Sequence, residues 1–189
     1  MRTLAIVLLS LVPGSIAAPI QAGELAGVTF PEQVAVDSRA LVLNGMGLRE
    51  ATLLKVDVYV AGLYLEKKSS DPGEIIRSEQ AKRLAMKFVR AVARKDLVKA
   101  WSEGFEKSAS PSTAALGDRI ATFNSWMIDM PNGATMSFTY VPGTGVAVEV
   151  QGATRGTIPG PDFAQALYGI WLGPSPPNPG LKEGLLGKH

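Results

Sequence analysis

Two arginines are the side chains of this sequence best suited to hold an organic anion. Arg49 follows the glycine-punctuated stretch "NGMG", which we interpret as a turn. Arg90 lies in the segment "RLAMKFVRAV" (Arg83 to Val92), where strand alternation places it on the same face as an apolar row. A planar guanidinium can hold a carboxylate or a phenolate through two parallel hydrogen bonds, so both residues are candidate ligand-binding groups.

Each arginine also has a purely structural interpretation. An arginine after a glycine turn is often solvated or caps nearby carbonyl groups. Burying an unpaired guanidinium is prohibitively unfavourable, so Arg90 requires a partner or a strand that leaves the core before it. The internal partner would be Asp57 or Glu149, and the external partner would be the carboxylate of an acyl ligand.

Tyr59 is the third candidate site residue. The residues from Leu53 to Leu65 alternate with period two, which predicts one long strand with its valines on the core face. Tyr59 shares the other face with Asp57, where its hydroxyl could hydrogen-bond a ligand. The structural alternative is a packed ring whose hydroxyl bonds a backbone group.

Two absences exclude whole classes of mechanism. The sequence contains no cysteine, and its one histidine is the final residue, His189. Disulfides, thiolate nucleophiles, serine–histidine–aspartate arrangements and multi-histidine metal sites are therefore excluded. We accordingly expect no metal and no cofactor.

The composition indicates one globular domain without a nucleic-acid surface. Apolar residues make up 46% of the 189 residues and charged residues 19%, a balance typical of a chain that buries a core. The net charge of +2 is small, and no window interleaves aromatic residues with a dense stripe of lysine and arginine. We expect no nucleic-acid partner.

The N-terminal stretch "MRTLAIVLLSLVPGSIAAPIQAGE" has the three-part layout of a secretory signal peptide. We predict a signal peptide over residues 1–22, cleaved after Ala22 or alternatively after Ala17, and a single domain over residues 23–189. The alternative is a buried N-terminal strand. No later segment is long and apolar enough for a membrane helix, so we expect an exported, periplasmic protein without a transmembrane segment.

The remaining periodicities predict strands, then two helices, then strands again and a last helix. Hairpin-length turns join most neighbouring strands, so we predict an α+β fold in which an antiparallel sheet carries helices on one face. The predicted elements are strands Leu53–Leu65 and Arg83–Val92, helix Ala93–Ser108, a helix from Ser110, a three-stranded meander from Ala134 with turns at Pro142–Gly145 and Gly152–Arg155, and a helix ended by Gly173; Ser69–Glu74 and Gly173–Gly180 are predicted loops.

Three blocks of the sequence resemble the chalcone isomerase superfamily. "LNGMGLREATLLKVDVYVAGLYLEKK" is similar to its opening block, a "G-x-G-x-R" turn followed by a strand and "G-[LV]-Y-L-E". "KFVRAVARKDLVKAWSEGF" looks like its strand-to-helix junction, and "YVPGTGVAVEVQGATRGTIPGPDFAQALYGIWLG" looks like the C-terminal half of bacterial chalcone isomerase-like members. The resemblance spans roughly Val28 to Leu186 and implies an open-faced β-sandwich, a curved antiparallel sheet with a helical layer on one face.

The resemblance implies more than one kind of activity. Plant chalcone isomerases close a chalcone into a flavanone, with the arginine of the "G-x-G-x-R" turn on the phenolate and a threonine and a tyrosine on the ketone. Arg49 matches that arginine, whereas Tyr59 stands at the position of the threonine. The family's downstream tyrosine, lysine and asparagine have no full counterpart, since no tyrosine precedes Lys99. Other branches bind fatty acids or act as non-catalytic helpers.

We therefore predict an exported, non-catalytic chalcone isomerase-like protein that binds a small amphipathic anion such as a fatty acid. Arg49, Tyr59 and Arg90 would be its ligand-binding residues, and apolar side chains facing them would hold the tail. One alternative is an intramolecular lyase in which Arg49 holds a phenolate and Tyr59 polarises a ketone. The other is an envelope scaffold without a ligand, in which both arginines are paired internally.

Overall fold

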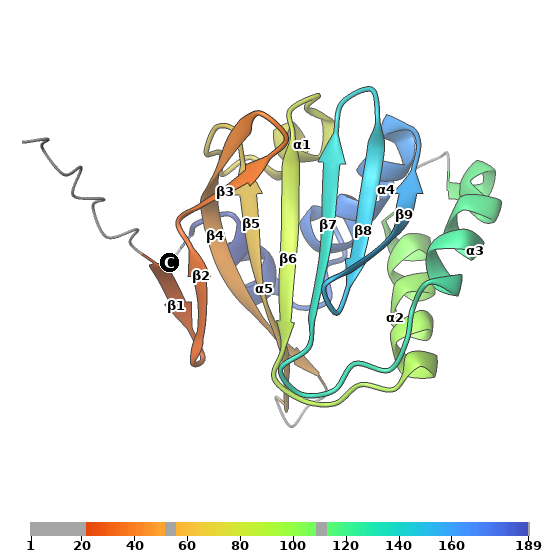
Figure 1. The fold of residues 1–189 in the computed structure, drawn as a ribbon, viewed down its shortest axis with the longest axis horizontal. Coiled ribbons are helices and arrows are strands. Elements are labelled where there is room, and N and C mark those ends of the chain that lie inside the picture. The colour runs from red at the N-terminus through yellow and green to blue at the C-terminus, as the bar shows by residue number, and fades with distance from the viewer. Residues whose placement is uncertain (1–21, 52–55, 109–112, 189) are drawn as a thin grey trace, which may run out of the picture.

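The computed structural model describes residues 22–51, 56–108 and 113–188. Within these residues the chain forms a seven-stranded antiparallel sheet in which each strand pairs with the strands next to it in the sequence (Figure 1). A separate two-stranded hairpin precedes the sheet. The hairpin consists of β1 (Ala22–Leu25) and β2 (Val28–Pro31), and the sheet of β3 (Gln33–Val36), β4 (Arg39–Ala51), β5 (Val56–Leu65), β6 (Lys82–Phe88), β7 (Thr135–Val141), β8 (Gly145–Val150) and β9 (Ala153–Ile158).

Helices cover one face of this sheet, and in Figure 1 α4 and α5 are seen behind the strands. The other face carries the β1–β2 hairpin at one side. This arrangement confirms the predicted α+β class and the open-faced sandwich. The helices are α1 (Pro72–Arg77), α2 (Arg94–Lys107), α3 (Gly117–Ser125), α4 (Pro161–Leu172) and α5 (Pro179–Leu185), with a 3₁₀ turn (Thr113–Leu116) before α3.

The sheet separates two apolar cores. The larger core lies between the helices and one face, and β5 contributes Tyr59, Ala61 and Leu63 to it. The smaller core lies under the β1–β2 hairpin and includes Val60 and Tyr64 of the same strand. Alternation favours the valine side of β5 as the core side, but the helices pack against the opposite side. Both faces of this strand are buried, so alternation of polar and apolar residues did not distinguish them.

A β-bulge at Asn44 decides which side of β4 faces the helices. Leu43 pairs with Tyr64 and Gly45 with Leu63, so Asn44 is the extra residue in the register. A one-residue shift turns every following side chain to the other face. The glycine-rich stretch lies within strand β4 and is not the predicted turn. Because Gly45 and Gly47 have no side chains, the backbone of α5 packs directly on this part of the strand.

Three local predictions also differ from the structure. The predicted loop Ser69–Glu74 contains the start of α1, because Asp71 accepts hydrogen bonds from the backbone N–H groups of the first turn. The predicted C-terminal loop ends at α5, which begins at Pro179. The last hairpin turns at Gln151 and Gly152, whose positive φ angles of 53° and 76° suit a two-residue turn.

Replacing Gly45 by alanine should destabilise the fold, because the added methyl group would overlap the carbonyl oxygen of Gly184 in α5. We expect the free energy of unfolding to fall by about 3 kcal/mol, measured by chemical denaturation. Gly117→Ala is the matched control, since a methyl group there meets nothing within 4 Å. Equal stabilities of the two variants would contradict the close packing of α5 on β4.

Lys82 is a buried cation that closes the end of α1. Its side chain is 1% exposed, and the rings of Tyr140 and Tyr168 lie 5.3 and 5.4 Å from its ammonium. Burial lowers the pKa of Lys82 to about 8, while the carboxylate of Glu79 opposes that shift. The ammonium donates hydrogen bonds to the carbonyl oxygens of Ile75 (2.6 Å), Ile76 (3.2 Å) and Ser78 (2.9 Å).

The titration of Lys82 should make the protein more stable between about pH 8 and pH 10. In this range the unfolded lysine, with its ordinary pKa of 10.5, still binds a proton that the folded state has released. The unfolded state then binds more protons, so the free energy of unfolding rises with pH. Denaturation curves at several pH values should show this rise in the wild type and a flatter profile in Lys82→Met. Parallel pH profiles of the two proteins would show that Lys82 does not titrate in this range.

Candidate functional site

The sheet register brings the first two predicted site residues together. Arg49 of β4 lies directly opposite Tyr59 of β5, and Tyr59 lies opposite Phe88 of β6. Residues directly opposite each other on neighbouring strands share one face of a sheet. The three side chains therefore form a row across β4, β5 and β6 on the face that the helices cover.

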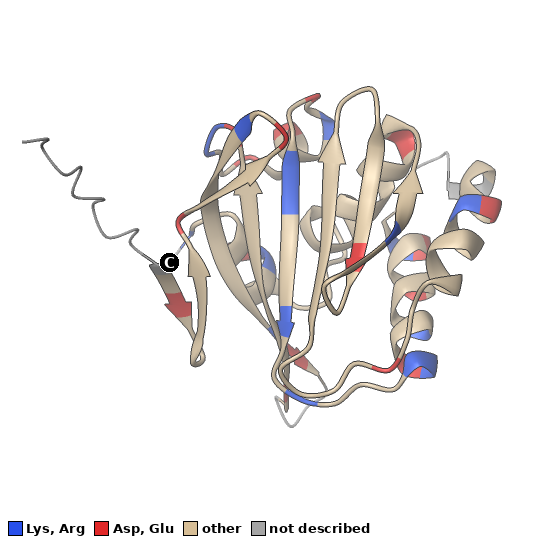
Figure 2. Cartoon of the chain, in the orientation of Figure 1, with Lys and Arg blue, Asp and Glu red and all other residues tan. Residues whose placement is uncertain are grey.

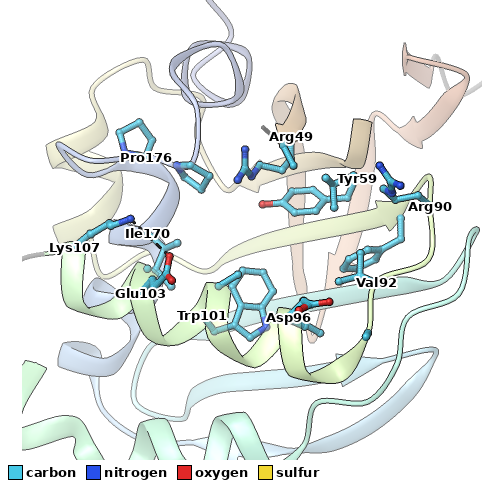
Figure 3. Close-up of a pocket in the computed structure, with 18 of the residues that line it drawn as sticks. Arg49, Tyr59, Arg90, Val92, Asp96, Trp101, Glu103, Lys107, Ile170 and Pro176 are labelled. Carbon is cyan, nitrogen blue, oxygen red and sulfur yellow. Dashed lines mark ion pairs between the residues drawn. The ribbon is translucent and has the colours of Figure 1, made fainter. Parts of the chain in front are cut away.

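This row forms one wall of a cleft of about 500 Å³ (Figure 3). The opposite wall is α2, and the segment between α4 and α5 closes one side. The floor is buried, whereas the rim includes exposed residues, so the cleft opens to solvent. The residues that matter most for its chemistry are Arg49, Tyr59, Phe88 and Arg90 from the sheet side, Leu97 and Trp101 from α2, Ile170 from α4, and Pro176 and Pro177 from the closing segment.

Arg49 lies partly buried beside Tyr59 in the wall of the cleft (Figure 3). Its Nη1 donates a hydrogen bond to the backbone carbonyl of the next residue, Glu50. This contact uses one of the five N–H donors of a guanidinium. Arg49 therefore does cap a nearby carbonyl group, as the structural interpretation predicts. Its side chain also lines the cleft.

Tyr59 is 5% exposed and lies in the wall of the cleft. Its hydroxyl oxygen accepts a hydrogen bond of 2.9 Å from Nε1 of Trp171. Burial raises the pKa of Tyr59 to about 12, although the hydrogen bond from Trp171 and the charge of Arg49 act in the other direction. The phenol is therefore neutral near pH 7 and keeps its proton. The predicted alternative, a hydroxyl bonded to the backbone, is replaced here by a bond to an indole.

Arg90 lies beyond the end of β6, which stops at Phe88, and it is exposed at the rim of the cleft. The two internal partners considered for it do not bind it. Glu149 pairs with Arg83 at 2.9 Å, and Asp57 is exposed in the register position opposite Glu50. Among the described residues Arg90 forms no ion pair. The strand leaves the core before this arginine, and that is why an unpaired guanidinium is tolerated.

The structure thus brings all three predicted site residues to one cleft. Arg49 and Tyr59 lie in its wall, and Arg90 lies at its rim. Lys99, which stands near the position of the family's catalytic lysine, does not line the cleft. Its Nζ lies 3.9 Å from Oε1 of Glu103 in an exposed ion pair.

The helix wall of the cleft has mixed charge. Asp96, Glu103 and Lys107 of α2 lie along it, and Glu103 lies 3.8 Å from Lys107. Charged residues recur along α2 and α3, whereas most of the sheet carries few (Figure 2). The pair between Glu103 and Lys107 is exposed and therefore weak. The sheet side of the cleft is the cationic side.

Two parts of this site were not predicted from the sequence. Trp171 is a core residue by its helical spacing, but its bond to Tyr59 joins positions 112 residues apart. The proline-rich segment before α5 was predicted as a loop with no role in a site. Nothing local in the sequence indicates that Trp171 contacts Tyr59 or that the proline-rich segment lines the cleft.

The structure does not indicate a metal centre in the described residues, where no group of three or more histidine, aspartate or glutamate side chains is close enough to bind an ion. One further polar group lies at the cleft. Trp101 is 3% exposed, and its indole N–H has no hydrogen-bond partner within the described chain.

The chain belongs to the chalcone isomerase-like family, because the family's model matches residues 22–187. A solved structure with a similar fold is that of a fatty-acid binding protein from Arabidopsis thaliana, with a TM-score of 0.68. The likeness covers 88% of this chain and 96% of that chain at 18% sequence identity, so it concerns the fold alone. No curated protein matches the sequence. No described helix has the length and apolarity needed to cross a bilayer.

Proposed function

We propose that this protein is a non-catalytic binder of a small amphipathic carboxylate, with a fatty acid as the leading ligand. The observation that carries the proposal is that Arg49, Tyr59 and Arg90 line a single cleft together with a set of buried apolar side chains. A volume of about 500 Å³ lies within the usual range of ligand sites. The similar fold of a plant fatty-acid binding protein supports this choice of ligand.

The carboxylate would bind between Arg49 and Tyr59. Arg49 offers charge and several N–H donors, and Tyr59 keeps its phenolic proton at neutral pH. Hydrogen bonds between charged donors and a carboxylate are about twice as strong as neutral ones. Arg90 is more exposed, so its contribution would come mainly through long-range attraction that speeds association.

The alkyl chain would lie along the buried side chains of the cleft. Phe88, Leu97 and Trp101 are each 3% exposed or less, and Ile170 faces them from α4. Burying an alkyl chain stabilises a complex by about 0.8 kcal/mol per methylene group. Pro176 and Pro177 add a rigid apolar border whose ordering requires little further loss of entropy.

The isomerase alternative has less support than binding. Arg49 occupies the position of the phenolate-binding arginine, but Tyr59 replaces the family threonine and fills part of the wall with an aromatic ring. The scaffold alternative required both arginines to be paired internally, and Arg90 has no ion pair among the described residues. Binding without chemistry is the function that uses all three side chains.

We further propose that the protein acts outside the cytoplasm. The support for this is the signal-peptide layout of residues 1–22, since targeting sequences of this kind are removed during export.

Dodecanoate is a suitable probe for the binding proposal. Isothermal titration calorimetry should give saturable binding to the wild type, and Arg49→Gln should weaken it more than tenfold, because a charged hydrogen bond contributes about 1.5–3 kcal/mol. Arg90→Gln should weaken it by about threefold and mainly at low salt. Arg155→Gln, which removes the same charge from an exposed site on β9, is the control and should bind like the wild type.

Equal dodecanoate affinities of the wild type and Arg49→Gln would contradict this head-group site, and no binding by the wild type would contradict the ligand class. The isomerase alternative predicts a different result. It requires flavanone formation from a hydroxylated chalcone above the uncatalysed rate, with loss of that activity in Arg49→Gln.

Export can be tested by the mass of the protein recovered from a Gram-negative host. Expression of the whole sequence should yield a periplasmic protein that begins at Gly23, or at Ala18 if the alternative site is cleaved. Intact-mass measurement of the periplasmic and cytoplasmic fractions distinguishes these forms. An uncleaved chain confined to the cytoplasm would contradict export.

A further inference from the structure

Behind the wall of the cleft lies a residue that contacts the site through the side chains that line it. Trp171 of α4 is 1% exposed and does not line the cleft. Its indole Nε1 donates a hydrogen bond of 2.9 Å to the hydroxyl oxygen of Tyr59 on β5. Among the described residues, Trp171 is the one hydrogen-bond partner of that hydroxyl. The contact therefore controls how Tyr59 can interact with anything in the cleft.

The direction of this bond is fixed by chemistry. An indole N–H is a donor and never an acceptor, whereas a phenol can do both. Tyr59 must accept from Trp171, so its own proton is directed to another partner. The raised pKa of Tyr59, about 12, keeps that proton in place at neutral pH.

The indole is held firmly in this orientation. Its ring packs against Trp101 at 5.4 Å and against Phe138 at 5.8 Å between ring centroids. Such aromatic contacts have preferred geometries and stabilise a single ring position. Rotation of Trp171 away from Tyr59 would disrupt the larger core, so the hydrogen bond is a fixed feature of the site.

The neighbour of Tyr59 on the cleft side is also a donor. Arg49 lies opposite Tyr59 in the sheet register, and its charge lowers the pKa of the phenol. A guanidinium accepts no hydrogen bond, so Arg49 and the phenolic proton do not satisfy each other. The guanidinium of Arg49 and the hydroxyl of Tyr59 lie close together in the cleft wall (Figure 3), so one bound acceptor could take hydrogen bonds from both.

We infer that Trp171 is a positioning residue that makes Tyr59 a dedicated hydrogen-bond donor, so that the cleft selects amphiphiles with an acceptor-only head group. A carboxylate accepts from both Arg49 and Tyr59. An alcohol of the same chain length also carries a proton of its own, and Trp171 already occupies a lone pair of Tyr59 that could have accepted it. The inference rests on the proposed function, because it concerns the head group of the same ligand.

The test compares the affinities of dodecanoate and dodecan-1-ol for the purified protein by calorimetry. The proteins are the wild type, Trp171→Phe, Tyr59→Phe and the double variant. Trp126→Phe is the control for loss of an indole, because Trp126 packs on Gly156 away from the cleft. A fifth variant carries 3-benzothienylalanine at position 171, which keeps the shape of the ring and removes only the N–H donor, so it stays informative if Trp171→Phe fails to fold.

The wild type should bind the acid more tightly than the alcohol. Loss of the indole N–H, by either replacement of Trp171, should lower the ratio of the two affinities about fivefold, the usual contribution of one net hydrogen bond. Tyr59→Phe should weaken acid binding about tenfold, since it removes a bond to a charged group. Adding Trp171→Phe to Tyr59→Phe should then leave the ratio unchanged, and Trp126→Phe should match the wild type.

An unchanged ratio in the benzothienyl variant would overturn the positioning role. The positioning role would also be overturned if Trp171→Phe lowered the ratio equally with and without the hydroxyl of Tyr59, because Trp171 would then act through packing. Either result leaves the proposed function intact if the wild type binds dodecanoate. Absence of dodecanoate binding by the wild type would overturn both proposals.

Discussion

The direct contact between the backbones of β4 and α5 is the constraint on which this site depends. Gly45 and Gly47 have no side chains, so the carbonyl groups of α5 approach the strand at a distance that would exclude a methyl group. Asn44 supports the contact from the bulge, because its side chain hydrogen-bonds the carbonyl oxygen of Leu185 at 2.8 Å and that of Ser69 at 3.0 Å. The same bulge turns Arg49 toward the helices. Without it, alternation would place this arginine on the hairpin side of the sheet.

The cleft follows from how the helices cover the sheet. Seven strands in sequential order make a wide face, and α4 and α5 pack on the part that carries the larger core. Strand β6 ends at Phe88, and α2 begins a few residues later, at Arg94. The row of Arg49, Tyr59 and Phe88 is not covered by a helix here and lines the cleft. Pro176 and Pro177, in the segment that connects α4 to α5, border the opening. The candidate site lies where the two layers separate.

Two buried polar side chains, Lys82 and Tyr59, have hydrogen-bond partners that hold them in one orientation. Lys82 is surrounded by the last carbonyl groups of α1, and Tyr168 donates to the carbonyl oxygen of Lys82 at 2.8 Å. Tyr59 is tied to Trp171 in the same way. Polar groups inside a protein are unfavourable when they are left unpaired, so these bonds restrict the orientation of each side chain. Tyr59 is held in the wall of the cleft, whereas Lys82 lies away from the cleft and closes the end of α1.

The sequence by itself determined the α+β class, the helices from Ala93 and before Gly173 and the apolar face of β6, because these depend on local periodicity and residue type. It also suggested the three candidate side chains, in part through the resemblance to the family. It did not determine the bulge at Asn44, which has no compositional signal and reverses the faces of β4. The sequence also left open whether Arg90 is buried, because the alternation of apolar and polar residues continues past Phe88, where β6 ends. Only the tertiary structure decided that Arg49, Tyr59 and Arg90 share one cleft and that Trp171 stands behind it. These facts depend on contacts between residues far apart in the chain, and such contacts are set by packing rather than by local pattern.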